Sequence, residues 1–178
     1  GEIRRHEEAM VLFEAMHTGH SVYATVHADS AAETVSRLIN PPISIPPNLL
    51  KSVNINVVMH RDRRRGIRRI SQLAEFEAEA DTAKANILYR WIPEEDKFVQ
   101  HSESSRFFED ISRHTGMSPT DINQDLEEKK KILSWLIKNK IRSLTDFGKV
   151  MNLYYKNKEI VLKAITKNEK ELIFGHVK

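Results

Sequence analysis

Two kinds of residue pattern divide this chain, and the division constrains its fold more than any other feature. Over residues 7–76, stretches with helical spacing of apolar residues alternate with short stretches rich in β-branched and aromatic residues. From Ser104 onward only helical patterns occur. Alternation of helix and strand is typical of α/β domains, whereas a run of helices is typical of a helical unit. The sequence therefore predicts an α/β part, with a possible antiparallel edge, followed by an all-helical part.

The α/β part begins with a predicted helix, strand and second helix. Residues 7–16 carry apolar side chains at i, i+3, i+4 and i+7, and Gly19 is a natural stop for that helix. Residues 21–26 have the composition of a strand. Ser30 and Glu33 form a capping-box pattern that predicts a helix to about residue 39, where two prolines end it.

Strands are predicted after a proline-punctuated connection. An arginine-rich turn with a glycine joins the first two, and a Pro-Glu-Glu-Asp turn joins the next two. The predicted strands cover residues 53–60, 67–76, 86–91 and 97–101.

Four helices are predicted in the rest of the chain, and residues 167–178 are expected to be a frayed end or tail. The helices cover residues 104–116, 118–140, 143–155 and 157–166. Their apolar stripes are expected to form the hydrophobic core. The two tryptophans are also expected to be large buried core residues. The apolar positions of the long second helix are Leu126, Ile132, Leu133, Leu136 and Ile137, and the tryptophans are Trp91 and Trp135.

Composition excludes several classes of protein. The chain has 178 residues, 40% of them hydrophobic and 30% charged, which permits a core and argues against global disorder. No apolar run is long enough to cross a bilayer, and no signal peptide is visible. The absence of cysteine excludes disulfides and thiolate zinc sites. Eight histidines are present, but their spacing does not match a zinc-protease helix.

The strongest charge feature is the segment 61–69, with six arginines. Such a segment could bind nucleic acid or acidic lipid. Aromatic residues that would stack on bases are not interleaved with it. A solvated hairpin, or an arginine contact across a subunit boundary, is therefore the favoured interpretation.

Three residues are candidates for chemistry. Glu2 could hold Mg²⁺ through water or polarise an attacking water. His27 stands at the carboxyl end of the predicted strand, the edge where α/β folds bind ligands, and could sense a γ-phosphate. His20 begins that strand, roughly 20 Å away if the segment is extended, so His27 ranks above it. Ordinary hydrogen bonding at strand ends is the competing interpretation for both histidines.

These pieces together resemble the type II/IV secretion ATPase family, over about residues 1–166. Gly1-Glu2-Ile3-Arg4 is similar to the family's second acidic box, and the stretch from Thr18 to Ala31 is similar to its histidine box. Arg37-Leu38, Asn40-Pro41-Pro42, the arginine turn before Glu75 and the Trp91–Asp96 hairpin are typical of the archaeal branch.

The resemblance implies a fold and an activity. The fold is α/β: residues 1–80 would be the C-terminal portion of a RecA-like P-loop ATPase core, residues 81–103 a β-hairpin connection and residues 104–178 a helical subdomain. The activity is ATP hydrolysis with Mg²⁺ in a homo-hexamer that drives secretion, pilus assembly or archaeal flagellum assembly. The ring would work in the cytoplasm, peripheral at the inner face of the membrane, with membrane platform proteins as partners and no direct nucleic acid.

The resemblance also assigns residues. Glu2 would be the catalytic carboxylate near Mg²⁺, with His27 near the γ-phosphate and His20 as the second histidine-box residue. Arg4, Thr18 and Thr25 would contribute to nucleotide binding. The alternatives are a basic nucleic-acid-binding module and an interaction module in the helical part.

Two departures from the family pattern matter. Position 5 is Arg5, which changes the charge beside Glu2. No G-x-x-x-x-G-K-[ST] sequence occurs, and that loop supplies the backbone amides and the lysine that hold phosphates. We therefore expect the chain to be part of a longer protein and to be inactive as an ATPase by itself.

Overall fold

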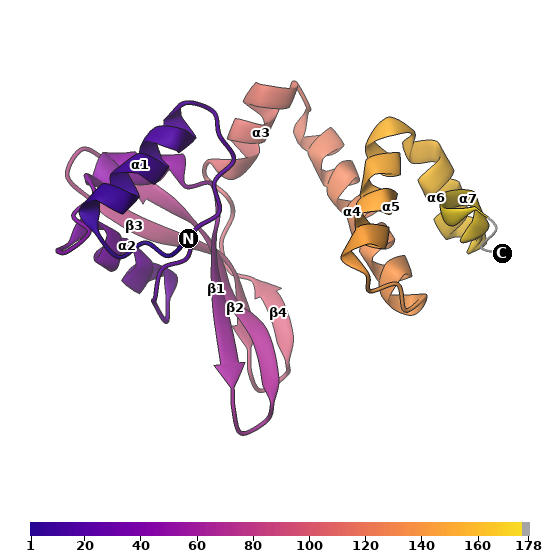
Figure 1. Cartoon of the computed structure of the whole chain (residues 1–178), viewed down its shortest axis with the longest axis horizontal. Coiled ribbons are helices and arrows are strands. Elements are labelled where there is room, and N and C mark those ends of the chain that lie inside the picture. The colour runs from indigo at the N-terminus through magenta and orange to yellow at the C-terminus, as the bar shows by residue number, and fades with distance from the viewer. Residues whose placement is uncertain (176–178) are drawn as a thin grey trace. The chain divides into compact units, whose positions relative to one another are not determined.

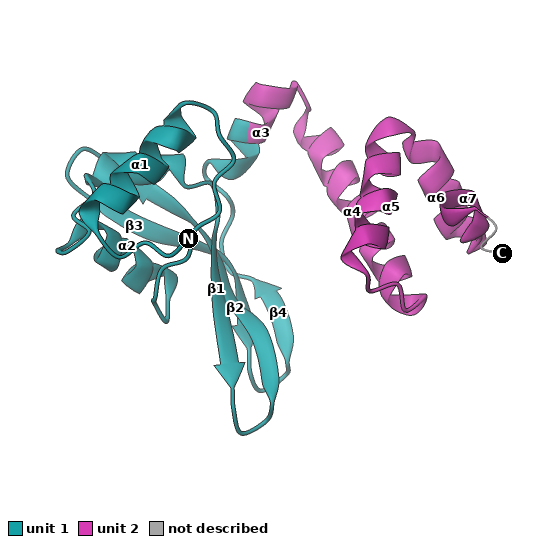
Figure 2. Ribbon diagram, viewed as in Figure 1, with its two compact units in different colours: residues 1–110 teal, residues 111–178 magenta. Residues whose placement is uncertain are grey.

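The computed structural model describes residues 1–175 and divides into two compact units. The first unit comprises residues 1–110 and the second residues 111–178 (Figure 2). The first unit is mixed α/β and the second is helical, in agreement with the change of pattern in the sequence. Residues 176–178, the end of the predicted tail, lie outside the described part of the chain.

The first unit holds two helices, a short 3₁₀ helix and four strands (Figure 1). Thr18 and Gly19, with φ of 86° at the glycine, end the first helix as predicted. The hydroxyl of Ser30 accepts a hydrogen bond from the backbone amide of Glu33 and so caps the second helix. The elements are α1 His6–His17, α2 Ala31–Ile39, the 3₁₀ helix η1 Pro47–Ser52, β1 Asn56–Asp62, β2 Ile67–Ala78, β3 Ala83–Ile92 and β4 Lys97–Gln100.

The four strands form one antiparallel sheet in the order β1-β2-β3-β4. The antiparallel pairing therefore extends over the whole sheet and is not limited to an edge. The β3–β4 hairpin belongs to the same sheet as β1 and β2. One face packs on the helices: Phe13 of α1, Leu38 of α2 and Phe76 of β2 share a buried cluster. Beyond the helices the sheet projects as an arm that ends in the β1–β2 turn, with β4 running alongside (Figure 1).

The predicted strand at residues 21–26 is wrong. Only Thr25 pairs with another segment, through an isolated parallel bridge to Glu2. A strand needs a hydrogen-bonded neighbour along its length, and the neighbouring segment at residues 1–3 offers one position. The side chain of Tyr23 is 91% exposed, whereas Val26 is partly buried against the core cluster, so only part of this segment packs on the core.

The second unit is a small helical bundle. Its buried core joins three helices: Ile132, Trp135 and Leu136 of α4, Val150 and Tyr154 of α5, and Val161 of α6. Its helices are α4 Pro119–Lys138, α5 Leu144–Lys156, α6 Lys158–Lys167 and α7 Glu171–Phe174, while α3 Phe107–Thr115 spans the division between the units. No helix within residues 1–175 is long and apolar enough to cross a membrane.

Three expectations for the helical part and the tryptophans need correction. Residues 171–174 form α7, whose Ile173 and Phe174 pack on the bundle core, so this part of the predicted tail is ordered by apolar contact. Trp91 is only half-buried, because it lies on the projecting sheet, whereas Trp135 is buried as predicted. The α4 stripe is only partly core. Its exposed members are Leu126 (45%), Leu133 (49%) and Ile137 (73%), which face away from α5 and α6.

Candidate functional site

A short parallel pairing creates the candidate site. The amide of Ile3 donates to the carbonyl of Thr25 at 2.8 Å, and the amide of Thr25 donates to the carbonyl of Gly1 at 2.9 Å. This register places the side chain of Glu2 beside that of His27. The Nε2 atom of His27 lies 3.1 Å from Oε1 of Glu2. Two residues 25 positions apart in sequence thus meet beside one short parallel pairing, Glu2 within it and His27 just after it.

Arg4 completes the cluster. One guanidinium nitrogen donates to Oε2 of Glu2, the carboxylate oxygen that does not face His27. The hydrogen bond from Arg4 holds the pKa of Glu2 below its ordinary value, and the charges of Arg4 and His27 lower it further against the opposing effect of burial. Glu2 is therefore an ionised carboxylate at neutral pH, with both oxygens facing cationic or hydrogen-bonding groups.

The other predicted site residues do not join this cluster. Nδ1 of His20 lies 3.0 Å from the hydroxyl of Thr18, which also donates to the carbonyls of Glu14 and Ala15 at the end of α1. Within the described residues, no hydrogen bond or ion pair connects His20 or Thr18 with Glu2. Thr25 contributes its backbone to the site, and its side chain is exposed.

The side chains of the cluster suit a magnesium ion that contacts Glu2 through water better than one bound directly to the carboxylate. Each oxygen of Glu2 already has a contact, one with Arg4 and one with His27, and the positive charge of Arg4 disfavours a metal cation bound directly to the carboxylate. Mg²⁺ keeps several of its waters and takes one or two carboxylates with substrate phosphates. Residues 1–175 contain no group of three His, Asp or Glu side chains able to hold a metal by themselves.

A large cavity adjoins the site in the first unit. Its volume is about 830 Å³, and its lining includes His27, residues 22–29, residues 55–59 of the β1 region and the buried Phe13 and Phe76. In the described chain, the backbone–backbone hydrogen bonds of residues 21–28 are the two that Thr25 makes. Strand β1 is also the edge of its sheet. Two unpaired backbone edges therefore line one space, whose lining is partly apolar and also includes Asp29, Glu33 and Arg37.

A buried carboxylate that the sequence patterns did not indicate is Glu75 of β2. It is 0% exposed and accepts five hydrogen bonds, with donors on β3 and on the segment that leads into α3. The donors are the amide of Ser105 (2.6 Å) and its hydroxyl (2.9 Å), the Asn86 amide group (2.9 Å), the hydroxyl of Ser104 (2.9 Å) and the amide of Phe107 (3.1 Å).

Hydrogen bonding decides the charge of Glu75. Burial raises the pKa of this carboxyl, but the donors from Ser105, Asn86 and Phe107 outweigh it and bring the pKa to about 2. The ionised carboxylate thereby ties the start of α3 to β2. In the sequence, Glu75 is a single acidic residue between Ala74 and Phe76. That pattern does not indicate which residues donate hydrogen bonds to its carboxylate.

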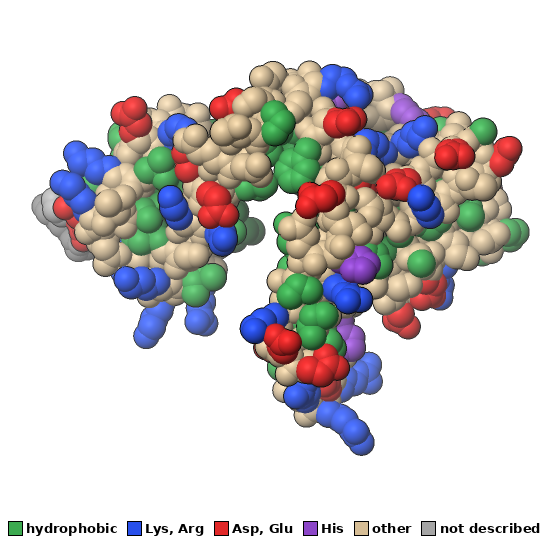
Figure 3. All heavy atoms as spheres, turned by 180° about the vertical axis from the view of Figure 1, so that it is seen from behind, with side chains coloured by type: hydrophobic (Ala, Val, Ile, Leu, Met, Phe, Trp, Pro, Cys, Tyr) green, Lys and Arg blue, Asp and Glu red, His purple; other side chains and the backbone are tan. Residues whose placement is uncertain are grey.

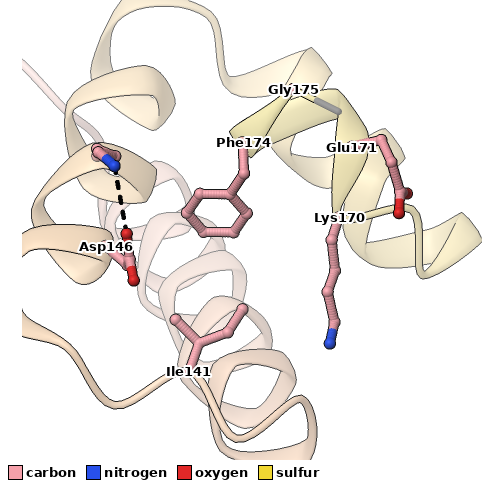
Figure 4. A pocket seen from close by; sticks show the side chains of 7 residues that line it. Ile141, Asp146, Lys170, Glu171, Phe174 and Gly175 are labelled. Atoms are coloured by element: carbon pink, nitrogen blue, oxygen red, sulfur yellow. Dashed lines mark hydrogen bonds and ion pairs between the residues drawn. The ribbon is translucent and has the colours of Figure 1, made fainter. Parts of the chain in front are cut away.

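A small pocket of about 370 Å³ lies in the second unit (Figure 4). Ile141 and Phe174 form its apolar side, and Asp146, Lys170 and Glu171 supply charges of both signs. Asp146 is paired with Lys149 at 3.3 Å. The pocket contains none of the residues predicted for chemistry, and its mixed charges select no particular ligand.

Comparison with known proteins supports the class that the motifs define. Residues 1–89 match the family described as type II/IV secretion system protein, and the chain belongs to this family. It is 32% identical to the uncharacterized protein MJ0900 of Methanocaldococcus jannaschii over 163 residues, which are 87% of this chain and 29% of the relative. It is also 32% identical to MJ1287 of the same organism over 145 residues, covering 79% of this chain and 53% of the relative.

A relative with a described activity matches a shorter part of the chain. The type IV pilus assembly ATPase PilB of Pseudomonas aeruginosa is 43% identical over 65 residues, 36% of this chain and 11% of PilB. The chain thus spans between about a tenth and about half of the length of these relatives.

Proposed function

We propose that this chain supplies the C-terminal part of the catalytic core of a secretion or pilus-assembly ATPase, which uses ATP and Mg²⁺ as a homo-hexamer. The convergence of Glu2 and His27 at 3.1 Å carries the proposal. A carboxylate and an imidazole beside one short parallel pairing are suited to a nucleotide phosphate and its attacking water.

Each member of the cluster has a role in this proposal. Glu2 would hold magnesium through its hydration waters and would orient the hydrolytic water, while Arg4 keeps that carboxylate ionised and in place. His27, with its side chain 83% exposed, is free to face the γ-phosphate. His20 and Thr18 would act at a different position, because they contact each other at the end of α1. ATP and magnesium, when bound, supply the phosphoryl group and the charge that neutralises it.

The cavity beside the site supports a RecA-like core. Its two unpaired backbone edges, in residues 22–26 and along β1, are suited to a further strand inserted between them. We propose that the longer protein supplies this strand together with the phosphate-binding loop absent from the 178 residues. Insertion would turn residues 21–26 into the strand that their composition favours, since both neighbours would then be present.

An interaction role for the second unit is part of the same proposal. Leu126, Leu133 and Ile137 lie at i, i+7 and i+11 on α4, so they share one face, and all three are exposed. Such a stripe is suited to a partner protein of the assembly, with the membrane platform proteins of secretion systems as candidates. A location at the cytoplasmic face of the membrane would follow from this contact.

ATP hydrolysis by the full-length protein that contains this chain tests the proposal. We expect magnesium-dependent turnover that Glu2→Gln lowers by about 100-fold or more and His27→Ala by about 10-fold or more. Glu79→Gln, at an exposed position just beyond β2, is the matched control and should keep full activity. The 178-residue chain alone should not hydrolyse ATP. A full-length protein without turnover, or an active Glu2→Gln variant, would reject the proposal.

A further inference from the structure

The β1–β2 hairpin presents several cations that pair with no acidic side chain among residues 1–175. We define the basic hairpin as residues 59–70. Five of its arginines are exposed, and Lys and Arg side chains gather at the free end of this arm (Figure 3). Within residues 1–175, four of them form no side-chain hydrogen bond or ion pair, namely Arg61, Arg63, Arg64 and Arg68.

Contacts at its base hold the basic hairpin in place. Arg69 forms two hydrogen bonds of 2.6 Å with the carboxylate of Asp96 in the β3–β4 turn. The indole of Trp91 donates to the same carboxylate at 2.8 Å, and its ring lies 5.5 Å from that of His60 on β1. Arg69 thus holds the hairpin against the β3–β4 turn. The other five arginines remain available for a partner.

Exposed apolar residues lie next to these arginines. Met59 and Ile70 are cross-strand partners, 65% and 40% exposed. Arg61 and Arg68 are partners two positions nearer the turn and share the face of the sheet with that pair. The hairpin therefore offers an apolar patch followed by a cationic end, which fits a surface with the opposite charge and its own apolar residue.

The outer face of α1 has that complementary composition. Glu7, Val11 and Glu14 fall at i, i+4 and i+7, so they form one stripe. Val11 is 64% exposed, and the side chains of Glu7 and Glu14 form no ion pair within residues 1–175. Beside the stripe lies a hollow of about 460 Å³, which Glu2, Glu8 and Leu12 also line.

We propose that the basic hairpin of one copy of this chain docks on the Glu7–Val11–Glu14 face of α1 in a second copy. The two surfaces are different parts of the same unit, so each copy has one of each, and the contact is heterologous. Heterologous contacts that close generate rings. The inference therefore deepens the proposed function: the contact delivers arginines of one subunit to the hollow beside Glu2 of the next.

Nucleic acid and an anionic membrane surface fit the basic hairpin less well than the α1 face does. A stacking surface for nucleic acid needs aromatic side chains among the cations, and residues 61–69 contain none. A membrane surface would meet the arginines first, while Met59 and Ile70 lie farther from the free end. The acidic and apolar face of α1 matches both parts of the hairpin, so a second copy is the favoured partner.

Charge reversal on each surface tests the contact in the 178-residue chain without nucleotide. One variant carries Arg63→Glu, Arg64→Glu and Arg65→Glu, and the other carries Glu7→Lys and Glu14→Lys. Sedimentation velocity at low salt should show concentration-dependent association of the native chain, weakened by at least about 10-fold in each variant. An equimolar mixture of the two variants should associate again, because each now complements the other. Reversing three lysines of the second unit (Lys131, Lys156 and Lys163) to Glu is the charge-matched control and should leave association unchanged.

Cross-linking locates the contact, since the chain has no native cysteine. A mixture of Arg64→Cys and Val11→Cys copies should form a disulfide-linked pair, and a mixture of Lys163→Cys and Val11→Cys copies should not. A native chain that stays monomeric up to about 1 mM and forms no cross-link would overturn the inference. So would a hairpin whose arginines bind anionic vesicles or nucleic acid but make no contact with α1. Since neither assay uses ATP, failure here with ATP hydrolysis intact in the full-length protein would reject this contact alone.

Discussion

The imidazole of His27 and the carboxylate of Glu2 lie 3.1 Å apart, although 24 residues separate them along the chain. The register of one parallel bridge produces this proximity, because Thr25 hydrogen-bonds to the residues on both sides of Glu2. A shift of that bridge by one residue would turn Glu2 to the other side of its segment. The geometry of the candidate site thus depends on two backbone hydrogen bonds.

The first prediction concerns the ionisation of Glu2. Arg4→Ala should raise the pKa of Glu2 towards its ordinary value, because the hydrogen bond from Arg4 is the main cause of its lowering. His27→Ala should raise the pKa by less. Carboxyl carbon chemical shifts followed by NMR across an acid titration measure both changes. Arg5→Ala removes the neighbouring arginine as a control and should leave the titration of Glu2 in place; an unchanged pKa in Arg4→Ala would contradict the assignment.

Local signals in the sequence predicted most elements of the fold, because each signal acts through nearby residues. Ser30 caps α2 through Glu33, and Gly19 ends α1, since both contacts span a few positions. The arginine turn and the Pro-Glu-Glu-Asp turn connect the strands of two hairpins as predicted, because turn residues also act locally. The strand at residues 21–26 failed because a strand depends on neighbours that local composition does not report.

The site was predictable in part. The motif order indicated that Glu2 and His27 belong to one site, and the structure brings these two side chains together. Their roles in hydrolysis remain predictions. The separate position of His20 followed from the length of the intervening segment, whereas Glu75 was not foreseen, because its donors come from residues up to 32 positions away.

The second prediction concerns the stability of the first unit. Glu75→Gln removes the charge and replaces one acceptor oxygen by a donor that faces other donors. A buried, hydrogen-bonded carboxylate lost in this way should cost about 2–4 kcal/mol of unfolding free energy. Urea denaturation followed by the NMR signals of β2 amides measures the loss. Glu79→Gln, at an exposed position beyond β2, should cost less than about 0.5 kcal/mol; an equal loss in the two variants would refute the role of Glu75.

The third prediction follows from the pKa of Glu75, which lies at about 2 in the folded chain against an ordinary value of 4.5. Because the folded value is lower, the unfolded chain binds the proton first as the pH falls. The stabilisation is therefore complete above about pH 4.5 and is lost between there and about pH 2, with a total on the order of 3 kcal/mol.

Unfolding free energies of the native chain and Glu75→Gln, compared from pH 6 down to about pH 2.5, test this dependence. The difference between the two should shrink as the pH falls, since the unfolded chain with Glu75 gains a proton at this carboxyl that the folded chain binds only near pH 2. A difference that stays constant over this range would show that Glu75 does not titrate as described.

The fourth prediction concerns the second unit, where a tyrosine hydroxyl joins two acidic side chains. The hydroxyl of Tyr154 donates to Glu128 at 2.7 Å and lies 2.9 Å from Asp125, and Glu128 is 7% exposed. Burial, together with these carboxylates, raises the pKa of Tyr154 above its usual range, so the hydroxyl stays protonated.

Tyr154→Phe keeps the ring in the core and deletes the donor, which leaves the buried Glu128 with only Gln124 and Lys158. We expect a loss of about 1–2 kcal/mol in the unfolding free energy of the second unit. Tyr155→Phe is the matched control: its side chain is 70% exposed, so removal of its hydroxyl should change stability by less than about 0.5 kcal/mol. Thermal or urea unfolding of both variants, followed by the fluorescence of the buried Trp135, separates the two cases. Equal stability of Tyr154→Phe and the native chain would mean that packing alone, and not the polar contact, holds α4 against α5.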